Sequence, residues 1–149
     1  MAVVVVIIAA AVAGWWFFLR TDPGYLDISK LNSQDTHVAK AQQYAKQSLP
    51  SKSEDLAMRY GLIAAYLYAG KEYTYSEHYY LTAQKTVEQR KLNQKDYRFY
   101  QGLSDTYEKL GNKAKAEQYK QKEKDAIKVN YSAKEIQQME EMKLNGRSR

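Results

Sequence analysis

The side chains best suited to acid–base or metal chemistry in this chain are two histidines, because it contains no cysteine. His78 follows Ser76 and Glu77, but neighbouring positions on a helix point in different directions, so these three residues do not form a catalytic triad. His37 belongs to no metal-ligand spacing, and the chain lacks the Walker loop, the G-x-G-x-x-G loop and the H-E-x-x-H motif. The sequence therefore predicts no enzyme, no catalytic residue, no metal site and no cofactor.

Tyrosines and charged residues remain as the side chains that could bind a partner. The chain has 14 tyrosines, and tyrosine suits both a small wet core and an interface because its large ring carries a polar hydroxyl. The net charge is +6, yet Glu117, Glu123 and Asp125 interrupt the lysines that crowd the last third of the chain. Nucleic-acid binding by charge needs an undiluted basic patch, so the sequence predicts no nucleic-acid partner.

An uncharged apolar run opens the chain. Ala2–Leu19 just reaches the roughly 17 to 20 residues that a bilayer-spanning helix needs, and Trp15 and Trp16 suit a membrane interface. The alternatives are a cleaved signal peptide, with its small-residue site at Ala11–Ala13, and a buried core helix. The favoured interpretation is a transmembrane anchor at residues 1–19.

The anchor interpretation predicts a single-pass membrane protein. We expect its body to lie outside the cytoplasm, although Arg20 and Lys30 favour the opposite orientation under the positive-inside rule. Residues 20–32 contain the turn signal Pro23-Gly24 and no helical period, so they are interpreted as a stalk.

The remainder of the chain shows helical periodicity and almost no strand alternation. Ser33, Asn93 and Asn112 are candidate N-caps, and the stretches SKSE and SAKE can form capping boxes. The predicted helices cover residues 33–48, 51–70, 72–90, 93–111, 112–128 and 132–145. The body at residues 33–145 is therefore predicted to be all-α, in antiparallel pairs, with a basic tail at residues 146–149.

Two glycines mark an internal repeat. A tyrosine stands four residues before each glycine and a leucine eight residues before it, and Gly70 and Gly111 are 41 residues apart (111 minus 70). We expect each glycine to turn the chain with a positive φ. Repeats of this length are typical of stacked helical solenoids.

These offsets, over residues 54–128, resemble the tetratricopeptide repeat (TPR) pattern of an aromatic residue, Leu with a small residue, Tyr, Gly and Ala. The repeat-defining positions are Leu62, Tyr66, Gly70 and Tyr79 in the first repeat (residues 53–91), and Tyr100, Leu103, Ser104, Tyr107, Gly111 and Ala116 in the second (residues 94–129). The pattern departs at Arg59, Ile63 and Tyr75. The resemblance implies a solenoid of helical hairpins whose open ends are covered by residues 33–48 and 132–145, and a looser array of similar hairpins is the alternative.

The resemblance also implies where a partner binds, because ligands of TPR proteins commonly lie on the concave surface made by the first helix of each pair. Carried over by offset, this surface contains Ala57, Tyr60, Ala64, Leu67 and Tyr68 from the first repeat and Arg98, Gln101, Asp105, Glu108 and Lys109 from the second. An apolar and aromatic half beside a charged half would suit an extended peptide or a partner helix. The alternative is that Tyr60, Leu67 and Tyr68 pack in the core.

The predicted function is a membrane-anchored scaffold that docks a partner protein, such as a subunit of a pilus or secretion machine in the cell envelope. One alternative is a structural subunit held through its transmembrane helix. Another is a binder of anionic polymer or lipid through the basic C-terminal third. Tyrosines around the helix near residues 73–80 are also compatible with self-association.

Overall fold

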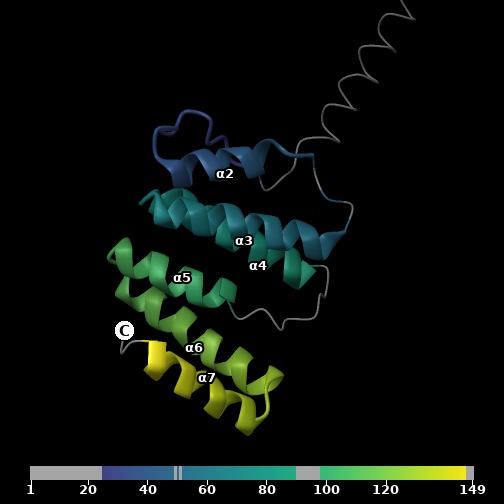
Figure 1. Ribbon diagram of the computed structural model, residues 1–149, viewed down its shortest axis with the longest axis vertical. Helices are drawn as coiled ribbons and strands as arrows, with labels where there is room; N and C mark the ends of the chain where they lie inside the picture. The colour runs from purple at the N-terminus through teal and green to yellow at the C-terminus, as the bar shows by residue number, and fades with distance from the viewer. Residues whose placement is uncertain (1–24, 49, 51, 90–97, 147–149) are drawn as a thin grey trace, which may run out of the picture.

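The computed structural model describes residues 25–48, 50, 52–89 and 98–146 (Figure 1). These residues form six α-helices and no strand, which confirms the predicted all-helical body. The helices are α2 (Thr36–Lys46), α3 (Ser53–Ala69), α4 (Tyr73–Gln89), α5 (Arg98–Lys109), α6 (Lys113–Asn130) and α7 (Ala133–Gly146). In Figure 1 they follow one another along the long axis of the molecule, from α2 at one end to α7 at the other.

The predicted membrane anchor needs a correction. Residues 1–19, to which it was assigned, lie outside the described residues. Among the helices that the structure does describe, none has the length and apolar character required to cross a bilayer. The transmembrane part of the predicted fold class and the predicted single-pass membrane location are therefore not supported, and both are withdrawn.

Several helix ends follow from local capping chemistry. The Asn112 side chain accepts a hydrogen bond from the Lys115 amide at 3.1 Å, as predicted. Ser132 and Glu135 form the predicted reciprocal capping box at the start of α7. The predicted cap at Ser33 is wrong, because α2 begins at Thr36 and the Asp35 carboxylate caps it by accepting from two amides. The predicted cap at Asn93 falls outside the described residues.

Helices α3 and α4 form one antiparallel hairpin, and α5 and α6 form a second. Their turns match at a spacing of 40 residues, because the residues with positive φ are Lys71 (φ 63°) and Gly111 (φ 75°), and 111 minus 71 is 40. The same spacing relates the closing hydrogen bonds, from the Glu72 amide to the Leu67 carbonyl at 2.8 Å and from the Asn112 amide to the Tyr107 carbonyl at 2.9 Å.

The predicted positive φ at Gly70 is wrong. This residue has a φ of −77° and caps the end of α3. Its lack of a side chain serves packing instead, since a Cβ atom there would lie 2.7 Å from Cγ2 of Val38 on α2. Gly70 therefore lets α2 approach the end of α3, and Lys71 takes the left-handed conformation that the turn needs.

Each hairpin is also closed by a serine hydroxyl that bonds to the facing helix. Ser76 Oγ donates to the Ala64 carbonyl at 2.9 Å, and Ser104 Oγ donates to the Ala116 carbonyl at 3.0 Å. The contact positions are again 40 residues apart (104 minus 64, and 116 minus 76). Small residues at these positions let the two helix backbones of each hairpin come close, which fixes how the helices of a hairpin pack.

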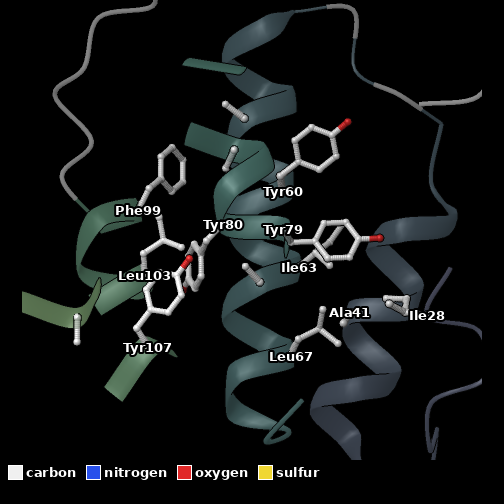
Figure 2. Packing of buried hydrophobic residues seen from close by; sticks show 14 residues of the cluster. Ile28, Ala41, Tyr60, Ile63, Leu67, Tyr79, Tyr80, Phe99, Leu103 and Tyr107 are labelled. Atoms are coloured by element: carbon white, nitrogen blue, oxygen red, sulfur yellow. The ribbon is translucent and has the colours of Figure 1, made fainter. Parts of the chain in front are cut away.

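The core has two parts that meet at the α3–α4 hairpin (Figure 2). On the α2 side lie the buried residues Ile28, Ala41, Tyr60, Ile63, Leu67 and Tyr79, and on the α5 side lie Tyr80, Phe99, Leu103 and Tyr107. The α3–α4 hairpin is therefore covered on both sides.

Residues 25–32, interpreted from the sequence as part of a stalk, pack against the helices instead. Ile28 is only 1% exposed. The Tyr79 hydroxyl donates to the Leu26 carbonyl at 2.7 Å and accepts from the Leu26 amide at 3.3 Å. The Gln42 side chain donates to the carbonyls of Ile28 and Leu31. This segment is a folded part of the body.

Candidate functional site

A groove with a volume of about 330 Å³ lies between α3 and α5, the first helices of the two hairpins. Helix α3 lines it with Met58, Gly61, Leu62 and Ala65. Helix α5 lines it with Arg98, Phe99, Gln101, Gly102 and Asp105, and α4 contributes Tyr80.

Two glycines allow aromatic rings to form the floor of this groove. A Cβ atom on Gly61 would collide with the ring of Phe99, which reaches across from α5 to α3. A Cβ atom on Gly102 would collide with Cζ of Tyr80, which reaches from α4 to α5. Both rings are more than nine-tenths buried. The groove therefore has a preformed floor, held by contacts among three helices.

The two rims of the groove differ in polarity. Met58 and Leu62 on α3 are 47% and 40% exposed, so this rim is apolar. On α5, the exposed side chains of Arg98 and Asp105 make the opposite rim charged. Met58 and Leu62 also border a second cavity of about 320 Å³ between α2 and α3, so the apolar rim faces a hollow on both sides.

Asp105 and the Tyr80 ring both line the groove, and the charge of Asp105 influences nearby tyrosines. Burial and then the nearby charge of Asp105 raise the pKa of Tyr80 to about 12. Burial also raises the pKa of Tyr68, with further contributions from Asp105, Tyr73 and Glu108. Both hydroxyls consequently stay protonated at neutral pH. The Tyr68 ring meets the edge of the Tyr73 ring, with centroids 5.5 Å apart.

The structure separates the predicted partner-binding residues into two groups. On α5, Arg98, Gln101 and Asp105 line the groove, and Glu108 and Lys109 are exposed further along the same helix. On α3, the side chains assigned to this surface mostly lie in the core: Ala57, Tyr60, Ala64 and Leu67 are at most 3% exposed. The Tyr60 ring contacts that of Tyr79 at 6.2 Å between centroids. Tyr68 is half-buried.

The one-residue difference in repeat spacing explains this outcome on α3. Subtracting 41 from the numbers of Arg98, Gln101 and Asp105 gives three buried positions, 57, 60 and 64. Subtracting 40 gives 58, 61 and 65, and all three residues at these positions line the groove. One residue along an α-helix turns a side chain by about 100°. The pairs of small residues at 64 and 76 and at 104 and 116, each 12 apart, carry the signal that would have given the correct spacing.

The predicted repeat-defining residues occupy varied environments. Tyr79, Leu103, Ser104, Tyr107 and Ala116 are buried. Tyr66 stacks on Tyr44 of α2 at 5.7 Å, and Tyr100 stacks on Tyr119 of α6 at 6.4 Å. Gly70 and Gly111 lie in the hairpin turns, and Leu62 lies on the rim of the groove.

The arrangement favours binding over bond chemistry. Within the part of the chain that the structure describes, no group of three or more His, Asp or Glu side chains could hold a metal ion. The His78 ring packs edge-on against Tyr79 at 5.5 Å. A preformed groove with an apolar rim, a charged rim and an aromatic floor can instead hold a polypeptide segment. Comparison with protein-family models, with curated proteins and with solved structures finds no match to this chain.

Proposed function

We propose that this protein is a binding module that holds a segment of a partner protein in the groove between α3 and α5. The observation that carries the proposal is the exposure of Met58 and Leu62 beside a preformed groove with a buried aromatic floor. Covering each of these half-exposed side chains would contribute roughly 1 kcal/mol to binding. The glycines keep the floor in place before a partner arrives, so little ordering is required on binding.

We also propose that the two hairpins are TPR-like repeats. At a spacing of 40 the TPR pattern of aromatic, large apolar, small, large apolar or Tyr, and small residues fits both hairpins. These positions are Tyr60, Ile63, Ala64, Leu67 and Ser76 in the first hairpin and Tyr100, Leu103, Ser104, Tyr107 and Ala116 in the second. The groove between the first helices is then the surface that such an array offers to a ligand.

Selection from a phage-displayed library of random twelve-residue peptides tests the docking proposal. The full chain serves as bait, and enriched peptides are synthesised and titrated against three proteins: wild type, Met58→Glu and Val129→Glu. Val129 is the matched control because it is an apolar residue on α6 with 85% exposure, outside the groove. We expect Met58→Glu to weaken binding at least about tenfold, because it places a charge on the apolar rim.

The control variant should bind like the wild type. Nuclear magnetic resonance of the labelled full chain should show shifts at Gly61, Ala65 and Gln101 when peptide is added. A library that yields no enriched peptide, or peptides that bind Met58→Glu and wild type equally well, would contradict the proposal.

A further inference from the structure

The floor of the groove contains a tyrosine hydroxyl that has no hydrogen-bond partner among the described residues. The Tyr80 side chain is nine-tenths buried and lines the groove. Its Cζ atom, which carries the hydroxyl, lies against Gly102, so the hydroxyl is placed beside α5. None of the hydrogen bonds within the described part of the chain involves this group. Among the described residues Gln84 Oε1 is the buried side-chain polar atom without a partner, so the Tyr80 hydroxyl reaches the open groove, where a ligand group or water can bond to it.

Asp105 and Glu108 bring negative charge to this end of the groove, whereas Arg98 lines it two turns before Asp105 on α5. Asp105 lines the groove one turn beyond Gly102 on α5, and Glu108 is exposed a further turn along. After burial, the charge of Asp105 also contributes to the raised pKa of Tyr80 and of Tyr68. Lys109 follows on α5 but does not line the groove. An anionic ligand group would be repelled here, and a cation would be attracted.

We propose that the Asp105 end of the groove binds a lysine or arginine side chain of the partner segment. This inference rests on the proposed function and specifies its partner. The cation donates hydrogen bonds to the Asp105 carboxylate and to the Tyr80 oxygen, whose lone pairs accept them. Its alkyl stem lies over the small residues Ala65 and Gly102, which line the groove beside Asp105.

The position of the apolar rim sets the sequence pattern of the segment. The midpoint between Met58 and Leu62 lies five positions before Ala65 on α3, which is about 7.5 Å along the helix axis. Two residues of an extended peptide span about 6.8 Å. The segment therefore carries a large apolar side chain two residues from its basic residue.

The same peptide library provides the test. We expect enriched peptides to share a lysine or arginine two residues from a large apolar residue. The strongest binder is then resynthesised with norleucine or citrulline in place of the lysine or arginine. Both peptides are titrated against the full-length wild type and the variants Asp105→Asn, Tyr80→Phe and Glu117→Gln. Glu117→Gln is the matched control, because it removes an exposed carboxylate on α6 outside the groove.

Asp105→Asn should weaken binding of the basic peptide about tenfold, because it removes a charged hydrogen-bond partner. Tyr80→Phe should weaken it about three- to tenfold, because it keeps the ring on Gly102 and removes only the hydroxyl. The neutral peptide should bind about tenfold more weakly to wild type and be unaffected by Asp105→Asn, since the two changes remove one interaction. Glu117→Gln should have no effect.

Enriched peptides without a basic residue, or a basic peptide that binds Asp105→Asn and wild type equally, would overturn this inference. If Met58→Glu still abolished the binding of these enriched peptides, the docking proposal would stand. The chain also ends in basic residues of its own, Lys143 in α7 and Arg147 and Arg149 in the tail. Peptides that bind a variant ending at Met142 but not the full chain would identify that tail as the occupant and would likewise overturn the inference of a partner segment.

Discussion

The α3–α4 hairpin and the α5–α6 hairpin have the same backbone arrangement. The residues at matching positions of their second helices, α4 and α6, differ in type and in burial. Tyr79 and Ala83 on α4 are completely buried. At the positions 40 residues later on α6, Tyr119 is only half-buried and residue 123 is a glutamate, itself 9% exposed. The Tyr119 ring stacks on Tyr107 at 5.5 Å between centroids and has the Lys122 ammonium 4.8 Å from its own centroid.

The difference follows from what covers each hairpin. Helix α2 and residues 25–32 cover one side of α3–α4, and α5 covers the other. On the outer side of α6 the array ends with α7, as Figure 1 shows. Tyrosine rings with lysine side chains over them suit this end, because they bury area and still present polar groups to water. The same hairpin backbone thus accommodates either set of side chains, and the neighbouring helices determine which set is suitable.

The substitution with the largest expected effect places in the first hairpin the residue type found at the matching position of the second hairpin. Ala83→Glu would place a carboxylate at a position with no exposure, and we expect a loss of at least about 3 kcal/mol in the free energy of unfolding. Ala114→Glu, on the exposed face of α6, is the control and should change stability by less than about 0.5 kcal/mol. Urea unfolding followed by circular dichroism measures both. A loss below about 1 kcal/mol for Ala83→Glu would show that this position on α4 accepts a carboxylate as readily as position 123 on α6 does.

Alkaline pH should lower the free energy of unfolding through tyrosines in both hairpins, and Tyr80 is the clearest case. Burial and the charge of Asp105 raise its pKa to about 12 in the folded state, against about 10 in the unfolded chain. The folded state therefore holds this proton more tightly. The associated stabilisation is fully present below pH 10 and is lost as the pH rises from about 10 to 12, by on the order of 2 kcal/mol.

Tyr80→Phe should remove this part of the alkaline loss. Unfolding free energies measured across that pH range, with tyrosinate absorbance recorded in parallel, check it. Burial and a hydrogen bond with Glu77 also raise the pKa of Tyr107, so part of the loss will persist in the variant. An identical pH profile for Tyr80→Phe and wild type would refute the expectation.

The smallest effect is expected from exchanging the two turn residues. Lys71 adopts a positive φ that costs a residue with a Cβ atom about 1 kcal/mol, whereas Gly111 adopts it freely. Lys71→Gly should therefore leave stability unchanged or raise it by up to about 1 kcal/mol, and Gly111→Lys should lower it by about 1 kcal/mol. Gly70→Ala should also destabilise, through its contact with Val38. Thermal unfolding of the three variants measures these changes, and a gain for Gly70→Ala would contradict the close contact between Gly70 and Val38.

Much of the fold could be predicted from local patterns. Helical periodicity indicated the all-helical body, and the side chains of Asn112, Ser132 and Glu135 marked two helix starts by short-range hydrogen bonds. The α5 side of the groove was also indicated, because Arg98, Gln101 and Asp105 are polar residues at helical spacing. These features depend on residues a few positions apart, which is the range at which sequence patterns carry information.

The α3 side of the groove could not be predicted by matching identical letters. Gly70 and Gly111 are the same residue type but meet different demands, a close helix contact in one case and a positive φ in the other. Aligning them shifted every assignment on α3 by one position, so Met58 and Ala65 were missed. The packing of residues 25–32 was missed because Leu26 and Tyr79 are 53 positions apart and no local pattern connects them.

The bonding of Tyr79 to Leu26 has a practical consequence for dissecting the molecule. A fragment that began after residue 32 would lose the Ile28 side chain, which contributes about 2 kcal/mol by burial. It would also strip the hydrogen-bond acceptors from the Tyr79 hydroxyl and the Gln42 amide, at about 1 to 3 kcal/mol for each group left buried. Together these losses approach the whole stability of a small domain. An autonomous unit of this array must therefore include Leu26 and Ile28, which lie well upstream of α2.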